Sequence, residues 1–442
     1  MKLVNAHILI VFIALLALPS KSIHAQAWTL QQCLDTAKVN NKNLQLGKNN
    51  LAIATEKHQE AKAGLLPKIS ANADYKYFTN MPYQLLPLST FNAMAPQGQF
   101  KEAQFGVQHN INANLQFLMP LYNAQIYGAI EATKLAGEIT NLQYQKSEEQ
   151  VLFEVTTLYY NAQILQHQIL FIDSNLSNAK KLLANMELLN QQLLAKVSDV
   201  NKVRLQVAQL TTQNENLTSK NKQILNALKL FMGLSLSQEL AIDNNIDFKQ
   251  MANYKNASTI EQKLIETNAI LIKNEIKTLN KTRFLPNLNL YGTYGTNGFG
   301  YDKQPNEFLK FYPIGFAGVQ ISYPIFSGTT TQRKLNQKRI EQKNVALQLS
   351  FQVDQNNAQI ENALMQRQVS QNTVKTIAQQ VELAREIYHH TILMQKEGTA
   401  NLTDVLLADN AIRESQQNYL NALVEYLKSD LELKRVSGNL KF

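Results

Sequence analysis

The sequence contains a single cysteine, Cys33, among its 442 residues. A disulfide within one chain needs two cysteines, so the fold cannot rest on a disulfide framework. The sequence also lacks Cys/His spacing suited to a metal, a glycine-rich phosphate loop and a nucleophile elbow. Only His389 and His390 are adjacent histidines, and neighbours on a helix point about 100° apart, which argues against a shared metal. We therefore expect no cofactor, no metal site and no enzymatic activity.

Clustered charge and long apolar runs are also scarce. The formal net charge is +9, but there is no run of five basic residues, so nucleic-acid binding has little support. The apolar run from Ile8 to Leu18 is too short for a membrane-spanning helix, which needs roughly 17 to 25 residues. Lys2 precedes this run, and the small residues Ala25 and Ala27 follow it. Residues 1–25 are therefore predicted to be an export signal peptide.

Proline is confined to a few regions of the chain. After the signal it occurs only within 67–120 and 286–324, with none from 121 to 285 and none after 324. Because proline costs about 3 kcal/mol inside a helix, the two proline-free stretches are predicted to form very long helices. The first of them carries apolar residues at alternating spacings of four and three, as in a coiled-coil seam: Val151, Val155, Leu158, Ala162, Leu165, Ile169, Ile172, Leu176, Ala179, Leu183 and Met186. A helix from about 123 to 190 would run roughly 100 Å, which suits a tube or rod and not a globular core.

The proline-bearing regions alternate with a period of two. From Val107 to Met119 most odd positions are apolar, and the even positions from 108 to 116 are all Gln or Asn. Four such segments are predicted to be strands, at about 66–78, 105–121, 285–298 and 313–326. Their length suits membrane β-strands with lipid on one face and water on the other. An antiparallel sheet on a soluble core would alternate in the same way, but the export signal and the long helices favour the membrane.

The order strand, strand, long helices occurs twice. The first repeat is expected at 26–235 and the second at 259–442, with its helices ending near 438; a linker or equatorial segment, 236–258, lies between them. Leu66-Pro67 corresponds to Leu285-Pro286, and Asp199-Val200 corresponds to Asp404-Val405. Four strands cannot close a barrel, and an open edge leaves backbone groups unpaired in lipid. The chain must therefore associate with copies of itself; two would supply eight strands, and three would supply twelve with a wider lumen.

In this order, the motifs resemble those of the TolC-like outer-membrane efflux protein family. The resemblance rests on the opening helix from Trp28 to Ala37, the Leu-Pro starts of the first strands, the proline-containing ends of the second strands, and the segment from Gly398 to Leu406. No single motif is specific, but the ordered set covers nearly the whole mature chain. It implies a mainly α fold with membrane β-barrel strands, in which a homotrimer shares a twelve-stranded β-barrel that continues into a periplasmic α-helical barrel.

The resemblance also implies a function. The chain would be an outer-membrane channel subunit of a tripartite efflux or type I secretion system, extending into the periplasm. It would act as a passive exit duct for substrates delivered by an inner-membrane RND or ABC pump through a periplasmic adaptor (membrane fusion) protein, and it would contact outer-membrane lipid. The alternative is a non-pore coiled-coil structural or spacer protein of the cell envelope.

Candidate site residues follow from the same resemblance. In the family, acids near the periplasmic tip ring the closed entrance and select cations, and Asp404 matches that position. The usual second acid is replaced by Leu407, and the nearest acid is Asp409, about 140° from Asp404 around a helix. The tips near 190–201 and 392–404 would meet the adaptor, with Val197, Ser198, Asp199, Gly398 and Thr399 as candidate contacts. The first tip lacks the family's usual glycine and has Lys196-Val197-Ser198 instead.

Overall fold

The structure is a computed structural model that describes residues 27–90, 94, 96, 98–104, 106–246, 254–301 and 309–440. The predicted export signal, 1–25, lies outside the described residues, as does 247–253 of the expected linker. The chain divides into two compact units. Unit 1 comprises Met1–Lys48, Tyr144–Ile260 and Val353–Phe442, and unit 2 comprises Asn49–Gln143 and Glu261–Gln352.

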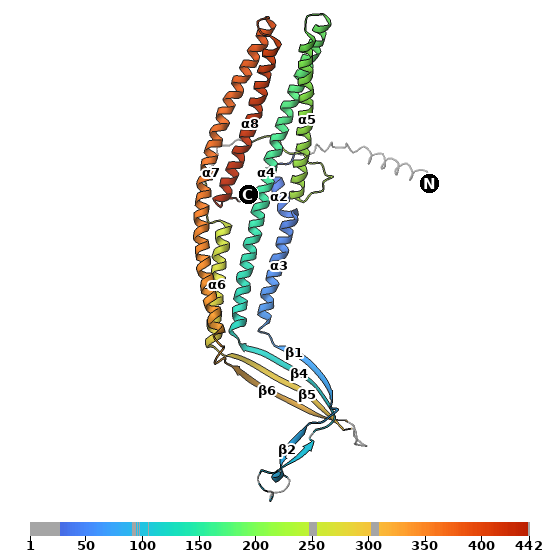
Figure 1. Cartoon of the computed structure of the whole chain (residues 1–442), viewed down its shortest axis with the longest axis vertical. Helices are drawn as coiled ribbons and strands as arrows, with labels where there is room; N and C mark the ends of the chain where they lie inside the picture. Colours follow the sequence, from blue (N-terminus) through green and yellow to red (C-terminus); the bar gives the residue numbers. More distant parts are fainter. Residues whose placement is uncertain are drawn as a thin grey trace, which may run out of the picture. The chain divides into compact units, whose positions relative to one another are not determined.

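Unit 2 contains a four-stranded antiparallel sheet with the order β1-β4-β5-β6 (Figure 1). Its strands are β1 (Lys68–Tyr77), β4 (His109–Tyr122), β5 (Asn287–Gly300) and β6 (Leu309–Ser322). Within the described part of the chain, β1 and β6 each pair on one side only. Every residue of β1 is exposed, and the described helices of this unit continue from the strand ends without covering a face of the sheet. A sheet on a soluble core would bury one face of each strand, and β1 buries neither.

Prolines and a short hairpin separate the observed strands from the expected ones. Strand β6 begins at Leu309, four residues before the expected start at 313. Pro313 therefore lies inside the strand, where it pairs with Thr296. Proline is tolerated there since β6 is an edge strand of the chain's own sheet. The segment 79–104, which joins the first two predicted strands and which the family resemblance implies to be an external loop, contains a hairpin. Its strands are β2 (Tyr83–Pro87) and β3 (Phe100–Gln104), and the short helix η1 (Leu88–Thr90) follows β2.

Two very long helices extend from the sheet, as the proline-free stretches predicted. Helix α4 (Ala124–Gln191) has 68 residues and helix α7 (Thr330–Lys396) has 67, so each is about 100 Å long. Every residue of the predicted apolar seam in α4 is buried or half-buried; Val155 and Ala162 are fully buried. The shorter helices α3 (Lys42–Ala63) and α6 (Ile260–Phe284) precede β1 and β5. No helix among the described residues is long and apolar enough to cross a membrane.

The core of unit 1 is built around the N-terminal helix. Helix α2 (Leu30–Asn40) begins with a capping box between Thr29 and Gln32. It buries Cys33 and neighbouring apolar side chains against α4 and α5 (Val197–Met232). Trp28 pairs with Ile242 in a parallel bridge, and the Tyr159 hydroxyl donates to the Trp28 carbonyl at 3.0 Å. These contacts hold the residues before α2 and the first part of the linker against α4 and α5.

A buried polar cluster joins the segment before α6 to the last helices. The Tyr254 hydroxyl donates to Asp430 on α8 (Leu402–Val436) at 2.7 Å, and Arg367 on α7 lies 3.4 Å from the same carboxylate. Burial raises the pKa of Asp430, while the Tyr254 hydrogen bond and the positive charges of Arg367 and Lys434 oppose this shift. The cluster therefore connects α7, α8 and the described end of the linker.

Candidate functional site at the helix tips

Each pair of helices in unit 1 ends in a short turn that has the same backbone design. Residues 192–196 join α4 to α5, and residues 397–401 join α7 to α8. The Leu194 amide donates to the Leu189 carbonyl at 2.8 Å, and the Thr399 amide donates to the Met394 carbonyl at 2.9 Å. These bonds close the C-terminal ends of α4 and α7 as Schellman motifs, which require a left-handed residue in the turn.

The left-handed residue is a leucine in one tip and a glycine in the other. Leu193 has φ 62° and Gly398 has φ 75°. This explains the missing glycine of the first tip: the position that needs it is Leu193, not the 196–198 segment. Leu193 and Gly398 correspond in the two repeats, because each lies six positions before the matching aspartates Asp199 and Asp404. A leucine in this conformation costs about 1–2 kcal/mol, whereas glycine has no such penalty.

Asp404 forms part of the cap of α8. Its Oδ2 accepts from the Asn401 backbone amide at 2.9 Å, and the Asn401 side chain accepts from the Asp404 amide at 3.1 Å. The carboxylate is exposed and lies in the first turn, where the helix dipole favours negative charge. In the first tip the cap residue is Lys196, which makes no such side-chain bond, and Asp199 lies 3.4 Å from Lys202.

Asp409 lies in a different environment from Asp404. Its Oδ2 accepts a hydrogen bond from Gln206 on α5 at 2.6 Å and lies 3.1 Å from Arg413. Burial raises the pKa of Asp409, and the charge of Arg413 and the hydrogen bond from Gln206 partly oppose this rise. The two acids therefore do not form a single exposed pair, in agreement with their angular separation on the helix.

The remaining tip candidates are mainly exposed. Val197 is 64% exposed, while Ser198, Gly398 and Thr399 are exposed and Asp199 is half-buried. Leu193 and Leu194 are 93% and 72% exposed, which adds two apolar side chains that the sequence analysis did not single out. Their position in a turn between two long helices was the available signal. The first tip thus presents an apolar surface, whereas the second presents Gly398 and a polar hydroxyl.

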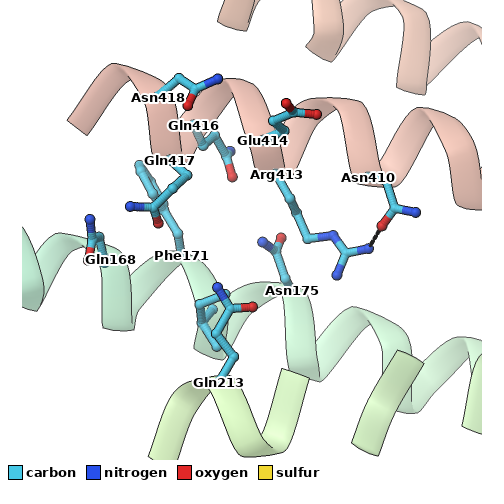
Figure 2. A pocket seen from close by; sticks show the side chains of 11 residues that line it. Gln168, Phe171, Asn175, Gln213, Asn410, Arg413, Glu414, Gln416, Gln417 and Asn418 are labelled. Carbon is cyan, nitrogen blue, oxygen red and sulfur yellow. Dashed lines mark hydrogen bonds between the residues drawn. The ribbon is translucent and has the colours of Figure 1, made fainter. Parts of the chain in front are cut away.

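A cleft of about 280 Å³ lies where side chains of α4, α5 and α8 converge (Figure 2). Most of its lining is uncharged amide: Gln168, Asn175, Gln213, Asn410, Gln416, Gln417 and Asn418. Arg413 donates to Asn410 at its edge, and Phe171 is one of its few apolar residues. Water can replace amide hydrogen bonds, so separating these helix faces costs less than opening an apolar seam of the same size.

A second cleft, of about 430 Å³, contains the buried acid. It is lined by Gln206, Asp409, Tyr388, Arg385, His389 and further residues of α4, α5, α7 and α8. Burial and the charge of Asp409 both raise the pKa of the Tyr388 hydroxyl. The helix interface near the tips is therefore polar in two places and carries one enclosed ion pair.

The described residues offer no metal cluster: no three His, Cys, Asp or Glu side chains come together in them. The rings of His389 and His390 are 6.3 Å apart and almost perpendicular. Burial raises the pKa of the Cys33 thiol to about 12, which disfavours the reactive thiolate.

The fold is that of outer-membrane channels of known structure. The chain superposes on VceC of Vibrio cholerae with a TM-score of 0.71 and 16% identity, covering 92% of this chain and 96% of that one. For the open state of MtrE of Neisseria gonorrhoeae the TM-score is 0.73 at 16% identity, covering 93% and 89%. The expected fold class, mainly α with barrel strands, is confirmed.

The sequence comparisons agree with this class. Residues 277–439 match the family model described as outer membrane efflux protein. The outer membrane protein TolC of Escherichia coli K12 is 21% identical over 456 residues, covering 96% of this chain and 85% of TolC. The alkaline protease secretion protein AprF of Pseudomonas aeruginosa is 25% identical over 161 residues, covering 36% and 33%. The chain is therefore similar to TolC-like outer membrane efflux proteins, both in its residues 277–439 and, at low identity, over most of its length.

Proposed function

We propose that the chain is one subunit of a homotrimeric exit duct, the outer-membrane channel of a tripartite efflux or type I secretion system, and not an enzyme. The observation that carries the proposal is the four-stranded sheet, with β1 and β6 unpaired on their outer sides and β1 exposed on both faces. In lipid, unpaired backbone groups cost several kcal/mol each, so β1 of one copy would pair with β6 of the next. Three copies supply twelve strands, enough for a water-filled lumen.

The partners proposed for this duct are a periplasmic adaptor and an inner-membrane RND or ABC pump. The names of its relatives support this class of system, since AprF is called a secretion protein and VceC an outer membrane protein. The adaptor would dock on the helix tips. There the exposed Leu193, Leu194 and Val197 would provide apolar contact, and Ser198, Asp199, Gly398 and Thr399 would provide the polar remainder.

The entrance of the duct is proposed to be controlled at the same tips. Asp404 is exposed and fixed by the cap of α8, so three copies would place three carboxylates in a ring that favours cations. Asp409 is enclosed between α5 and α8 and would link helices instead of lining the opening. The amide-lined cleft of Figure 2 would let α8 separate from α4 and α5 at modest cost.

The deciding experiment is the native mass of the protein extracted from outer membranes in mild detergent. Three mature chains per particle, together with single-channel conductance in planar bilayers, are expected. A monomeric particle, or release from membranes by alkaline washing without detergent, would instead favour the non-pore spacer protein of the envelope.

A further inference from the structure

The net positive charge of the chain gathers at one corner of unit 2. We define the basic corner as the last fourteen residues of α6 (271–284) and the first fourteen of α7 (330–343). It contains nine cations: Lys273, Lys277, Lys281, Arg283, Arg333, Lys334, Lys338, Arg339 and Lys343. Its two acids, Glu275 and Glu341, leave a net charge of +7. Removal of the predicted signal, residues 1–25, would remove Lys2 and Lys21 and lower the net charge of the chain from +9 to +7. The remaining residues outside the basic corner then have a net charge of zero.

The first repeat provides an internal comparison. Its equivalent corner is formed by the last fourteen residues of α3 (50–63) and the first fourteen of α4 (124–137). That corner has three cations and three acids and is neutral: Lys57, Lys62 and Lys134 against Glu56, Glu60 and Glu131. Both corners join strands to helices in the same way, so the architecture does not require the positive charge of the second.

The basic corner does not neutralise itself. Lys338 lies 2.8 Å from Glu275 and 2.7 Å from Glu341, which uses both acids on one cation. In the part of the chain that the structure describes, the other eight cations have no carboxylate partner, and all eight are exposed. Eight like charges on adjacent helix ends repel one another, which an anionic surface would relieve.

Exposed apolar side chains lie where the basic corner meets the sheet. Phe284, at the end of α6, is 63% exposed and lies just before β5, and Ile325 and Phe326, just after β6, are 91% and 83% exposed. Arg283 precedes Phe284, and Lys281 lies about 5 Å from the end of α6 by helical rise. An apolar band followed by lysine and arginine matches the order of hydrocarbon and phosphate headgroups at a bilayer surface.

The corner also contains a cleft of about 360 Å³ between α4 and α6. Lys273, Lys277 and Lys281 line it at successive turns of α6, and Tyr127 and Glu131 line it from α4, so that its charged side chains sum to +2. The Asn274 side chain donates to the Gly128 carbonyl at 3.2 Å, which brings the two helices close together. Three ammonium groups along one cleft provide a site where a phosphate diester can contact more than one cation.

We propose that the basic corner binds the phosphate groups of anionic phospholipids in the leaflet at the helical end of the sheet. This rests on the proposed membrane insertion of the sheet. A juxtamembrane cluster of lysine and arginine is attracted to an anionic lipid surface, with each cation adding to the affinity and salt screening it. The second repeat would thus hold each subunit to lipid at one side, where the first repeat has no comparable charge.

The test compares lipid retention by the full mature protein. The protein is equilibrated in detergent with equal amounts of dioleoyl phosphatidylglycerol and dioleoyl phosphatidylcholine, and bound lipid is counted by native mass spectrometry. The variant K273Q/K277Q/K281Q is compared with K57Q/K62Q/K134Q, the matched control from the neutral corner. A second variant, R333Q/K334Q/R339Q, tests the α7 side independently of the cleft.

We expect the wild type and the control to prefer phosphatidylglycerol, with a preference that weakens at high salt. Either corner variant should lose the preference by roughly tenfold or more. Added glycerol 3-phosphate should not compete at millimolar concentration, because the site recognises a lipid surface. Competition by this soluble phosphate would instead assign the corner to a free anion and overturn the lipid proposal.

Two further results would also overturn the proposal. One is unchanged lipid preference in both corner variants, and the other is an equal loss in the control. Altered anion conductance with unchanged lipid binding would place these lysines in the lumen. A particle that is not trimeric, or that does not insert into vesicles, would instead contradict the proposed channel function, so the two failures are distinguishable.

Discussion

Leu193 and Gly398 occupy the same left-handed position in the turns after α4 and α7, with φ 62° and 75°. Leu193 is 93% exposed, so its side chain gains almost no burial in return for the unfavourable backbone. Such strain persists where surrounding structure or function maintains it. The exposed leucine is consistent with a contact surface at the first tip, as proposed for the adaptor.

Replacing Leu193 with glycine should stabilise the first tip. Relief of the left-handed backbone is expected to contribute about 1 kcal/mol, reduced by the greater freedom of glycine in the unfolded chain. Hydrogen exchange of the amides in 189–197 should slow accordingly. Gly398→Ala is the matched opposite change and should speed exchange in 394–401. Faster exchange in Leu193→Gly would contradict the strain assigned to this residue. If Leu193 contacts the adaptor, the same variant should bind adaptor more weakly despite its greater stability.

Asp404→Asn should alter conduction more than it alters folding. The substitution removes the proposed ring charge but keeps a polar side chain at the cap of α8, so the loss of stability should stay below about 1 kcal/mol. In planar bilayers, block by a multivalent cation on the periplasmic side should weaken by tenfold or more. Asp199→Asn serves as control, since Asp199 is half-buried beside Lys202. Unchanged block in Asp404→Asn would remove this residue from the entrance.

Asp409 should make stability depend on pH. Burial raises the pKa of its carboxyl, in spite of Arg413 and Gln206, so the folded chain holds the proton more tightly than the unfolded chain. Its contribution to the free energy of unfolding is therefore complete below about pH 4 and declines as pH rises through the folded pKa. Asp409→Asn removes this titration. The melting temperature of the variant relative to wild type should rise between pH 4 and 7, and parallel curves would show that Asp409 does not contribute.

Arg367→Ala should destabilise unit 1 strongly. Asp430 is 8% exposed, and removal of the cation 3.4 Å away leaves it with the Tyr254 hydrogen bond and the charge of Lys434. Loss of one partner from a buried ion pair costs roughly 3 kcal/mol. Arg385→Ala on the same helix is the control, because Arg385 and Glu382 form an exposed pair worth less than about 1 kcal/mol. Equal denaturation midpoints for the two variants would argue against the buried cluster as an anchor of the linker.

Gly295→Ala should disrupt the sheet between β4 and β5. An added Cβ would overlap the Ala113 carbonyl oxygen and lie 2.6 Å from the Asn114 Cα, opposite Gly295 in the register. Overpacking of this kind costs about 1–3 kcal/mol, so the fraction of the proposed trimer found by native mass in mild detergent should fall. Gly137→Ala in α4 meets no atom within 4 Å and should be neutral or slightly stabilising. An unchanged fraction of trimer in Gly295→Ala would contradict the prediction that the added Cβ disrupts the pairing of β4 with β5.

The long helices and main strands were predictable because each depends on a local pattern. Proline-free stretches with a regular apolar seam define α4, and a period of two defines β4 and β5. The β2–β3 hairpin was not among the four predicted strands, because the family resemblance implies an external loop between the first two strands. The fourth strand was predicted to begin at about Pro313, but β6 begins at Leu309 and contains this proline, which an edge strand tolerates.

The tip geometry depends on contacts that no single stretch of sequence contains. The spacing of Asp404 and Asp409 in the sequence was enough to predict that they lie on different faces of the helix. The hydrogen bond from Gln206 to Asp409 was not predictable in this way, because it joins residues 203 positions apart. The left-handed role of Leu193 could have been inferred from its repeat partner, Gly398. The amide-lined cleft of Figure 2 could not, because glutamine and asparagine in a long helix are typical of a solvent-exposed face.

Cys33 has a practical consequence for following motion at the tips. Its thiol is fully buried, and burial raises its pKa to about 12, so it reacts slowly with maleimides and methanethiosulfonates at neutral pH. A reporter cysteine in place of an exposed tip residue would then take a spin label selectively. Distances between labels could be recorded in the otherwise unmodified chain, without first preparing a cysteine-free background.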